Sequence, residues 1–237
     1  LLFLNPSLRT RTSFELGMQQ LGGIAIVLQP GKDAWGVEFE AGAVMEGDAE
    51  EHITEVAGVL SRYCDLIALR AFPPFRDWKV DREDRVIRAL AAHASVPVIN
   101  METIVHPCQE LALMLTLREK LGDTRKRKFL LTWTWHPRPL NTAVANSALL
   151  IASKFGMDVT LLCPEEAYRL DPQFEAAARE FADRVIALTV RGGIGIEIMS
   201  GGVSGLVFRS VKEGSGPGPQ ATDTVRVHYR GTFPDGR

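Results

Sequence analysis

The sequence predicts an α/β protein with two lobes, each built on a parallel sheet with helices on both faces. Three observations lead to this fold. Short apolar runs alternate with longer helical patterns over about the first 185 residues, as expected for βαβ units. The length of 237 residues suffices for one large domain or two ordinary ones. Hydrophobic residues make up 46% of the chain and charged residues 24%, which is typical of a folded soluble protein.

Strands are expected where short apolar runs, many of them rich in β-branched residues, are bounded by turn residues. Six runs fit: 1–4, 24–28, 66–69, 97–99, 129–132 and 159–162. Between them, periodicity and capping residues predict helices at about 10–21, 50–63, 81–93, 107–121, 141–155 and 165–185. Pro107 suits a first helical position, Asn141 can cap its helix, and Gly156 suits the position just past a helix end.

The chain changes character after about residue 185. Six glycines fall between Arg191 and Gly205, a composition typical of a flexible linker. Beyond them, turn residues and an alternating run at 224–229 predict a short β-rich segment. We therefore expect four parts: a first domain at 1–121, a partial second domain at 122–188, a linker at 189–204 and a β-rich fragment at 205–237.

Composition and charge exclude several function classes. The formal net charge of −2 and the isoelectric point of about 6.3 supply no basic field that would recruit nucleic acid or an anionic membrane. No apolar run reaches the roughly 18 residues that cross a bilayer, and no signal-peptide pattern opens the chain. Three widely spaced cysteines argue against a disulfide framework or a metal cluster, so we expect a cytoplasmic protein. Because the chain begins inside an apolar run without a methionine, we also expect a piece of a longer protein.

The sharpest local signal is the run Ser7-Leu8-Arg9-Thr10-Arg11, which lies where a strand passes into a helix. Free backbone N–H groups and the helix dipole make such a terminus an anion site. The two arginines add planar forks suited to phosphate oxygens, and the hydroxyl side chains add further donors. The run therefore predicts phosphate binding, with an ordinary capped helix carrying exposed arginines as the alternative.

Two motifs in order resemble a known family. The run at 7–11 resembles the Ser-x-Arg-Thr-Arg signature of the aspartate/ornithine carbamoyltransferase superfamily, and His106-Pro107-Cys108-Gln109 resembles its His-Pro-x-Gln signature. Three further stretches, at 28–35, 100–103 and 131–137, resemble the N-acetylornithine branch of this superfamily. The similarity extends from residue 1 to about residue 185.

The resemblance implies a function and an assembly. A member of this branch transfers the carbamoyl group of carbamoyl phosphate to the δ-amine of N-acetyl-L-ornithine, giving N-acetylcitrulline and phosphate in arginine biosynthesis. The implied partners are these two substrates and two further copies of the chain in a homotrimer with shared sites. No cofactor, no metal, no nucleic acid and no membrane are implied.

The resemblance also assigns roles to single residues. It implies that phosphate is held by Ser7, the backbone of Leu8, Arg9 and Thr10, and that the carbamoyl group is bound by His106 and Gln109. Arg70 would bridge the phosphate and the carbonyl oxygen, and Trp35 would reach the site of a neighbouring subunit. Glu102 would contact acetylornithine, and Glu50 would favour an acetyl over a succinyl group. Thr10, Arg70 and His106 would be the catalytic donors at the oxyanion that develops on the carbonyl.

Each of these residues also has a structural interpretation. His106 could cap its helix, Arg70 could lie on the surface at a strand end, and Glu102 could be an ordinary surface acid. Trp35 could pack on its own core instead of reaching a neighbour. Cys108 stands beside the site, but the motif gives it no base, so we do not expect a nucleophilic thiol.

The tail at 205–237 resembles the opening strands of an FKBP-type prolyl isomerase, with Tyr229 matching a pocket tyrosine. This leaves two alternatives to the carbamoyltransferase. One is a peptidyl-prolyl isomerase named for its tail, and the other is a fragment that binds carbamoyl phosphate without turnover. Isomerisation of a proline peptide would identify the first, and binding without citrulline formation the second.

Overall fold

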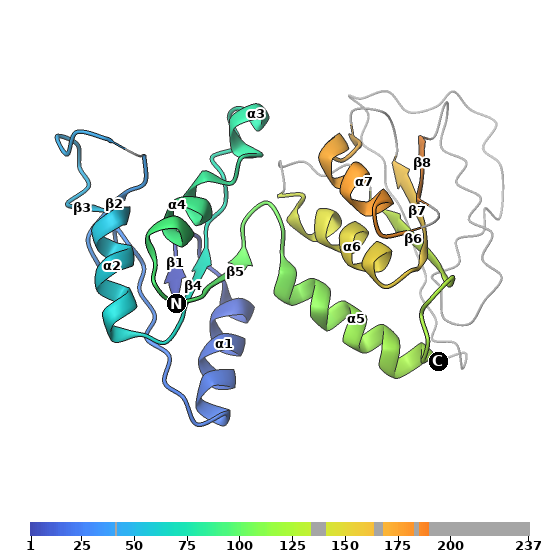
Figure 1. The fold of residues 1–237 in the computed structure, drawn as a ribbon, viewed down its shortest axis with the longest axis horizontal. Coiled ribbons are helices and arrows are strands. Elements are labelled where there is room, and N and C mark those ends of the chain that lie inside the picture. The colour runs from blue at the N-terminus through green and yellow to red at the C-terminus, as the bar shows by residue number, and fades with distance from the viewer. Residues whose placement is uncertain (41, 134–140, 164–167, 183–184, 190–237) are drawn as a thin grey trace, which may run out of the picture.

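The computed structural model describes residues 1–40, 42–133, 141–163, 168–182 and 185–189. The expected linker and β-rich tail lie outside the described residues, apart from Thr189 at the linker's start. In the described part, two parallel sheets lie side by side, joined by the long helix α5 (Pro107–Leu121) (Figure 1). The expected two-lobed α/β fold is confirmed.

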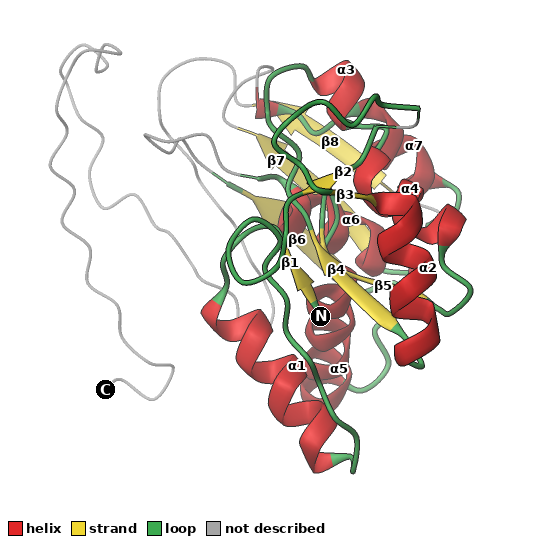
Figure 2. Cartoon of the chain, turned by 90° about the vertical axis from the view of Figure 1, so that its left-hand side faces the viewer, coloured by secondary structure: helices red, strands yellow, loops and turns green. Residues whose placement is uncertain are grey.

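The first lobe contains a three-stranded parallel sheet in the order β1-β4-β5 and a separate pair, β2-β3. Its strands are β1 (Leu2–Phe3), β2 (Val37–Glu38), β3 (Glu51–His52), β4 (Ile67–Arg70) and β5 (Val98–Glu102). Its helices are α1 (Leu8–Gln20), α2 (Ile53–Tyr63), α3 (Trp78–Asp81) and α4 (Arg85–His93). Helices α1 and α2 flank the strands from opposite sides in both views (Figures 1 and 2).

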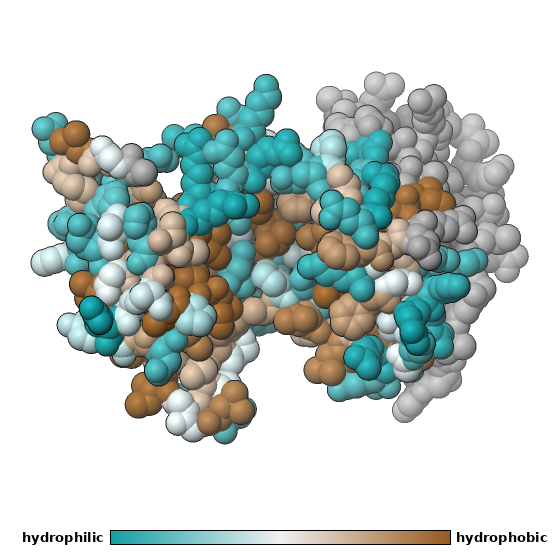
Figure 3. All heavy atoms as spheres, viewed as in Figure 1, coloured by the Kyte–Doolittle hydropathy of each residue, from teal (hydrophilic) through white to brown (hydrophobic). Residues whose placement is uncertain are grey.

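The central strand β4 of this lobe is buried along its whole length, as expected for a parallel strand covered on both faces. Leu69 and the helix residues Ile53 and Leu90 are almost fully buried in one cluster. At the far end of α1 the surface is different, because Leu21 and Ile24 are largely exposed and apolar atoms gather there (Figure 3). Exposed apolar groups of this kind are typical of contact surfaces when they are contiguous.

The second lobe is a parallel sheet in the order β6-β7-β8. Its elements are β6 (Lys128–Thr132), α6 (Ala143–Lys154), β7 (Asp158–Cys163), α7 (Pro172–Arg179) and β8 (Val185–Thr189). Leu149 of α6 and Val159 of β7 are fully buried in its core. Met114 of α5 belongs to the same cluster, and Trp78 of the first lobe packs against it. The two lobes therefore share apolar contacts, and α5 packs as part of the second core.

Several local expectations are confirmed. Helix α5 begins at Pro107 and ends at Leu121, as predicted, with Pro107 in its first turn. Gly156 adopts φ +68° just past α6, and its N–H and that of Met157 bond back to the carbonyls of Ser153 and Ala152. This is the pattern of a glycine-terminated helix. The start of α6 differs from the expectation, because its cap residue is Thr142, which makes no side-chain cap bond; Asn141, one residue earlier, accepts the N–H of Ala143 through Oδ1 at 3.1 Å.

Some element boundaries differ from the expectation. The run 24–28 forms no strand; it meets β1 through a bridge between Leu28 and Leu2, and Ile26 accepts a bond from the amino group of Leu1. The expected helix 81–93 is split, because Asp84 adopts φ +52°, which no helix tolerates. The helix expected at 50–63 begins at Ile53, after the short strand β3.

The first three residues of the helix expected at 165–185 lie outside the described residues, and the expectation is wrong at 168–171 and at 185. Helix α7 begins only at Pro172, where Asp171 caps it by accepting the N–H of Gln173 at 2.8 Å. It ends at Arg179, and Val185 begins β8 rather than closing a helix. A proline at the first helical position and an aspartate cap fix this later start.

Two kinds of feature are absent from the described residues. None of the helices in the described ranges has the length and apolar character to span a membrane. Within the same ranges, histidine, cysteine and acidic side chains form no group of three or more arranged to hold a metal ion.

Candidate active site

Several of the predicted site residues meet at the carboxyl ends of the first lobe's parallel strands, where α/β sheets place ligands. Arg70 is the last residue of β4 and Glu102 the last residue of β5. The register between the two strands shifts after Leu69, which pairs with Asn100, so that Arg70 pairs with Glu102. An irregularity of this kind re-aims side chains. Here it places the two charged groups opposite one another at the edge of the sheet.

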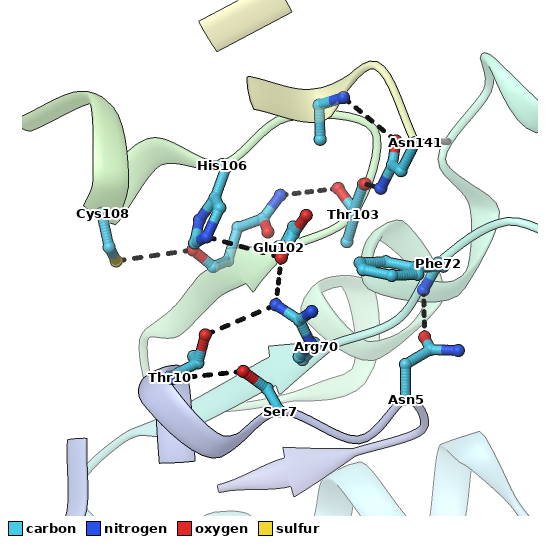
Figure 4. Close-up of polar contacts among 12 residues, drawn as sticks. Asn5, Ser7, Thr10, Arg70, Phe72, Glu102, Thr103, His106, Cys108 and Asn141 are labelled. Atoms are coloured by element: carbon cyan, nitrogen blue, oxygen red, sulfur yellow. Dashed lines mark hydrogen bonds and ion pairs between the residues drawn. The ribbon is translucent and has the colours of Figure 1, made fainter. Parts of the chain in front are cut away.

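A chain of polar contacts joins four predicted residues (Figure 4). The guanidinium Nη1 of Arg70 donates to Glu102 Oε2 and to Thr10 Oγ1, the latter at 3.4 Å. His106 Nε2 lies 3.4 Å from the same Glu102 oxygen. Arg70, Glu102 and His106 are only 7% to 8% exposed. The interpretations of Arg70 and Glu102 as surface residues are therefore wrong.

Arg70 is further held by the loop that follows β4. Its guanidinium lies 4.6 Å from the centroid of the Phe72 ring, a cation–π distance. The N–H of Phe72 donates to Asn5 Oδ1, which ties this loop to the turn after β1. Arg70 Nε is buried and has no hydrogen-bond partner among the described residues. A buried donor of this kind is costly unless a ligand satisfies it.

His106 is not a side-chain cap, because no side-chain cap bond exists at the start of α5. Burial is the main cause that lowers the pKa of His106, and the charge of Arg70 lowers it further. The carboxylate of Glu102 and a backbone hydrogen bond oppose this shift without reversing it. The imidazole is thus neutral near pH 7 and can donate one N–H to an acyl oxygen.

The segment 7–10 is held differently. Ser7 caps α1 by accepting the N–H of Thr10 through Oγ at 3.2 Å, and no acidic residue stands in the first turn. Leu8 is 83% exposed, and Arg9 is also exposed. Arg11 is paired with Glu15 along the helix at 3.1 Å. The start of α1 therefore presents backbone donors, the positive end of its dipole and Arg9 beside the Arg70 cluster.

Two residues of the second motif lie in the first turn of α5. Gln109 is exposed, and its N–H donates to the carbonyl of His106 at 3.1 Å. Cys108 Sγ donates to the carbonyl of Asn100 at 3.7 Å. Burial raises the pKa of the Cys108 thiol, and Glu110 adds to that effect. A thiol that holds its proton is a poor nucleophile, in agreement with the expectation.

Trp35 and Glu50 are not brought to this cluster. They adjoin β2 and β3, which lie beside α2 on the side of the first sheet away from the second lobe (Figure 1). Glu50 Oε2 accepts the N–H of Gly36 at 3.1 Å, so Glu50 is tied to the residue next to Trp35. Trp35 is 66% exposed at the rim of a cavity of about 620 Å³. Its indole is therefore not packed on its own core.

Sequence reasoning missed the residues that hold the loop between β5 and α5. Thr103 is fully buried, donates through Oγ1 to Asp84 Oδ2 at 2.7 Å and accepts from Asn100 Nδ2 at 2.8 Å. Asn141, Asn146 and Ser147 bond to the same loop from about 40 residues further along the chain. No local pattern marks such contacts. The buried polar residues of the otherwise apolar helix α6 were the available signal.

Taken together, the geometry fits a compact oxyanion. Donors converge from the start of α1, from Arg70 and from His106, while Glu102 supplies an acceptor among them. Such a set of fixed donors stabilises negative charge that develops on a reacting oxygen. The carboxylate adds a place for a cationic or N–H-bearing group.

Comparison with known proteins agrees with this geometry. Residues 1–119 match the family model of the aspartate/ornithine carbamoyltransferase carbamoyl-P binding domain. The chain is 64% identical over 186 residues to the N-acetylornithine carbamoyltransferase of Xanthomonas campestris pv. campestris, covering 77% of this chain and 55% of that protein. It is 37% identical over 188 residues to the N-succinylornithine carbamoyltransferase of Bacteroides fragilis, covering 79% and 58%.

Solved structures give the same result. The chain superposes on an acetylornithine transcarbamylase complexed with acetylcitrulline with a TM-score of 0.76 at 60% identity, covering 78% of this chain and 58% of that one. A mutant N-acetyl-L-ornithine transcarbamylase complexed with carbamyl phosphate and N-succinyl-L-norvaline gives a TM-score of 0.76 at 59% identity. The match covers 79% of this chain and 58% of that one. The chain spans somewhat more than half the length of these relatives. It belongs to the aspartate/ornithine carbamoyltransferase family, and residues 1–119 correspond to the carbamoyl-P binding domain of that family.

Proposed function

We propose that this chain carries the carbamoyl-phosphate site of a carbamoyltransferase that acts on N-acetyl-L-ornithine. The observation that carries the proposal is the contact chain from Thr10 through Arg70 and Glu102 to His106, beside the capped start of α1. The similarity to N-acetylornithine carbamoyltransferases at 61% to 66% identity supports the choice of acceptor. The N-succinylornithine enzymes are more distant, at 36% and 37% identity.

In this proposal the phosphate group lies against the backbone N–H groups at the start of α1, with Ser7, Thr10 and Arg9 as side-chain donors. The unprotonated δ-amine attacks the carbonyl carbon and forms the new nitrogen–carbon bond, so that negative charge builds on the carbonyl oxygen. The carbon–oxygen bond to phosphate then breaks, and the proton lost by the amine leaves with the phosphate. Thr10, Arg70 and His106 stabilise the charge on the carbonyl oxygen. Each donor of such a set is typically worth roughly 2.7 to 4 kcal/mol in the transition state.

Gln109 and Glu102 complete the substrate contacts. The exposed first turn of α5 leaves the Gln109 side chain free to reach the carbamoyl amide. Glu102 pairs with Arg70 in this structure, so ligand binding has to redirect part of that interaction to the substrate. A carboxylate at this position suits an N–H group of the acetylornithine.

Trp35 and Glu50 act together in a neighbouring subunit. The hydrogen bond from the Gly36 N–H to Glu50 ties Glu50 to the residue next to Trp35. If the Trp35 indole contacts another copy of the chain, the Glu50 carboxylate therefore lies close to the same contact. We therefore propose a homotrimer with shared sites, in which Glu50 lies near the acyl group of the acceptor. Dissociation of the trimer, measured by light scattering, should then remove carbamoyl-phosphate binding together with the Trp35 contact.

The division of the chain follows the same proposal. Residues 1–121 form the carbamoyl-phosphate domain, 122–188 the start of the acetylornithine domain, and 189–204 a linker to the tail at 205–237. The prolyl-isomerase resemblance of that tail remains a prediction from the sequence. A proline-peptide isomerisation assay on the chain tests it independently of carbamoyl phosphate. A cytoplasmic location is likewise proposed from the use of cysteine.

The decisive experiment is a calorimetric titration of the chain with carbamoyl phosphate, using Arg9→Ala and Arg11→Ala as a matched pair. Both arginines are exposed on α1, but Arg11 is already paired with Glu15. We expect saturable binding that weakens at least about tenfold in Arg9→Ala, as for loss of a charge-assisted contact, and stays close to wild type in Arg11→Ala. Absence of binding by the wild-type chain would overturn the proposal.

A further inference from the structure

The loop 103–106 between β5 and α5 determines where His106 stands. It is buried throughout, apart from the half-buried Val105. Inside the loop, the N–H of Thr103 bonds to the carbonyl of Val105 at 2.9 Å. Its remaining backbone groups need partners from elsewhere, because a buried unpaired N–H or C=O is costly.

Three of these partners come from the second lobe. Asn141 Nδ2 donates to the carbonyl of Thr103 at 2.7 Å (Figure 4), and Asn146 Nδ2 donates to the carbonyl of Ile104 at 2.9 Å. Ser147 Oγ accepts the N–H of His106 at 2.6 Å. Asn146 is fully buried and Ser147 almost so. Side chains at the start of α6 thus fix the backbone of a first-lobe loop.

The bond at Ser147 is the one closest to the chemistry. It holds the backbone N–H of the residue whose imidazole lies 3.4 Å from Glu102. The Ser147 side chain also lies near the carboxyl of Glu110, one turn into α5. Burial raises the pKa of Glu110, and the nearby Ser147 hydroxyl partly offsets this. One hydroxyl therefore receives a hydrogen bond from the loop and lies beside α5.

We propose that Ser147 is a positioning residue for His106, and that the second lobe thereby sets the geometry of the carbamoyl-phosphate site in the first. The proposal rests on the proposed function for its effect on binding. Ser147 touches neither substrate in this proposal and acts only through His106. Small displacements of His106 matter, because a misplacement of about 1 Å in a catalytic group can lower the reaction rate about a hundredfold.

The same helix offers a matched control. Ser153 is fully buried like Ser147, but its hydroxyl donates only to the Leu149 carbonyl of its own helix, at 2.8 Å. Ser147→Ala and Ser153→Ala therefore remove the same atom from equally buried places on α6. Two readouts are compared: the Kd for carbamoyl phosphate by calorimetry, and the imidazole signals of His106 by NMR. A His106→Gln variant identifies these signals.

We expect Ser147→Ala to weaken carbamoyl-phosphate binding by about tenfold and to move the His106 signals, while Ser153→Ala changes neither. Equal effects of the two variants, or no effect of Ser147→Ala, would overturn the proposal. If the wild-type chain binds no carbamoyl phosphate, the proposed function fails, and the His106 signals alone decide the positioning role. If Ser147→Ala does not fold, Ser147→Cys keeps the volume with a weak acceptor and replaces it in both comparisons.

Discussion

The two halves of the anion site are built in opposite ways. The segment at the start of α1 is largely exposed, and most of its contacts are local, since Ser7 caps the N–H of Thr10 and Arg11 pairs with Glu15; the bond from Arg70 to Thr10 is the long-range exception. The loop that carries His106 is buried, and the bonds that hold it include two from α6 and one from Asn141 just before that helix, all about 40 residues away. The first segment supplies free donors and positive charge. The second supplies a rigid position.

This difference indicates how a phosphate ester can both enter and be activated. An open helix terminus admits the ligand and still exposes its donors to water, so its electrostatic contribution is moderate. The buried Arg70, Glu102 and His106 act where the dielectric is low and each interaction is stronger. Substitutions in the exposed segment should therefore change mainly ligand binding, whereas substitutions in the buried cluster should change both binding and the free energy of unfolding.

The largest effect is expected for Arg70→Met. It leaves Glu102 buried without its cation, a change that typically costs about 3 to 5 kcal/mol in stability. The cost should lie toward the lower end, because the charge of Arg70 lowers the pKa of His106 and its loss lets the imidazole take up a proton beside Glu102. Carbamoyl-phosphate binding should disappear. Urea unfolding and calorimetry measure the two effects.

The double variant Arg70→Met with Glu102→Gln is the control for this result. Removing both charges takes away the uncompensated carboxylate, so most of the stability should return. Binding should not return, because the donor is still missing. If Arg70→Met alone is as stable as the wild type, the Arg70–Glu102 pair does not contribute to the stability of the fold.

An intermediate effect is expected at Ser7, on the exposed segment. Ser7→Ala removes the cap of α1 and should cost about 1 kcal/mol in stability. Ser7→Asp keeps the cap, so its thermal stability should match the wild type, but its carboxylate should repel phosphate and weaken binding more than alanine does. Equal binding by the two variants would show that the phosphate does not lie at this terminus.

A smaller effect is expected from pH. Burial lowers the pKa of His106, so below about pH 6.5 the unfolded chain takes up a proton that the folded chain resists. The contribution of His106 to stability is thus complete above about pH 6.5 and is lost as the pH falls toward the lower pKa of the folded state. The Tm of the wild type should fall more steeply between pH 7 and 5 than that of His106→Gln. Parallel curves would place His106 in solvent.

Sequence patterns predicted the elements whose signals are local. Pro107 fixed the start of α5, and the apolar run before Arg70 marked a buried strand, so both were found within one residue. The expected helix 165–185 had the wrong start because the cap at Asp171 is a local signal, and the longer periodic pattern concealed it. The run 24–28 looks like a strand, but it lies where the first sheet offers it a single bridge.

The candidate site shows the same limit more clearly. The two motifs identified Thr10 and His106, and the family resemblance added Arg70, but their convergence depends on the strand register between β4 and β5, which no motif encodes. Ser147 and Asn146 carried no signal except being polar in an apolar helix, since their partners are more than 40 residues away. Contacts of this range follow from the packing of α6 against α5, and packing is decided by the whole chain.

The smallest effect is expected at Leu8, and it tests the open character of the first segment. Leu8 is 83% exposed in the first turn of α1, so Leu8→Ala should change the free energy of unfolding by less than about 0.5 kcal/mol. Its proposed contribution to phosphate binding is the backbone N–H, which alanine keeps. The Kd for carbamoyl phosphate should therefore stay within about twofold of wild type, a difference under about 0.5 kcal/mol. A clearly weaker Kd at unchanged stability would mean that the leucine side chain covers the ligand, and the terminus would then close on binding rather than stay open.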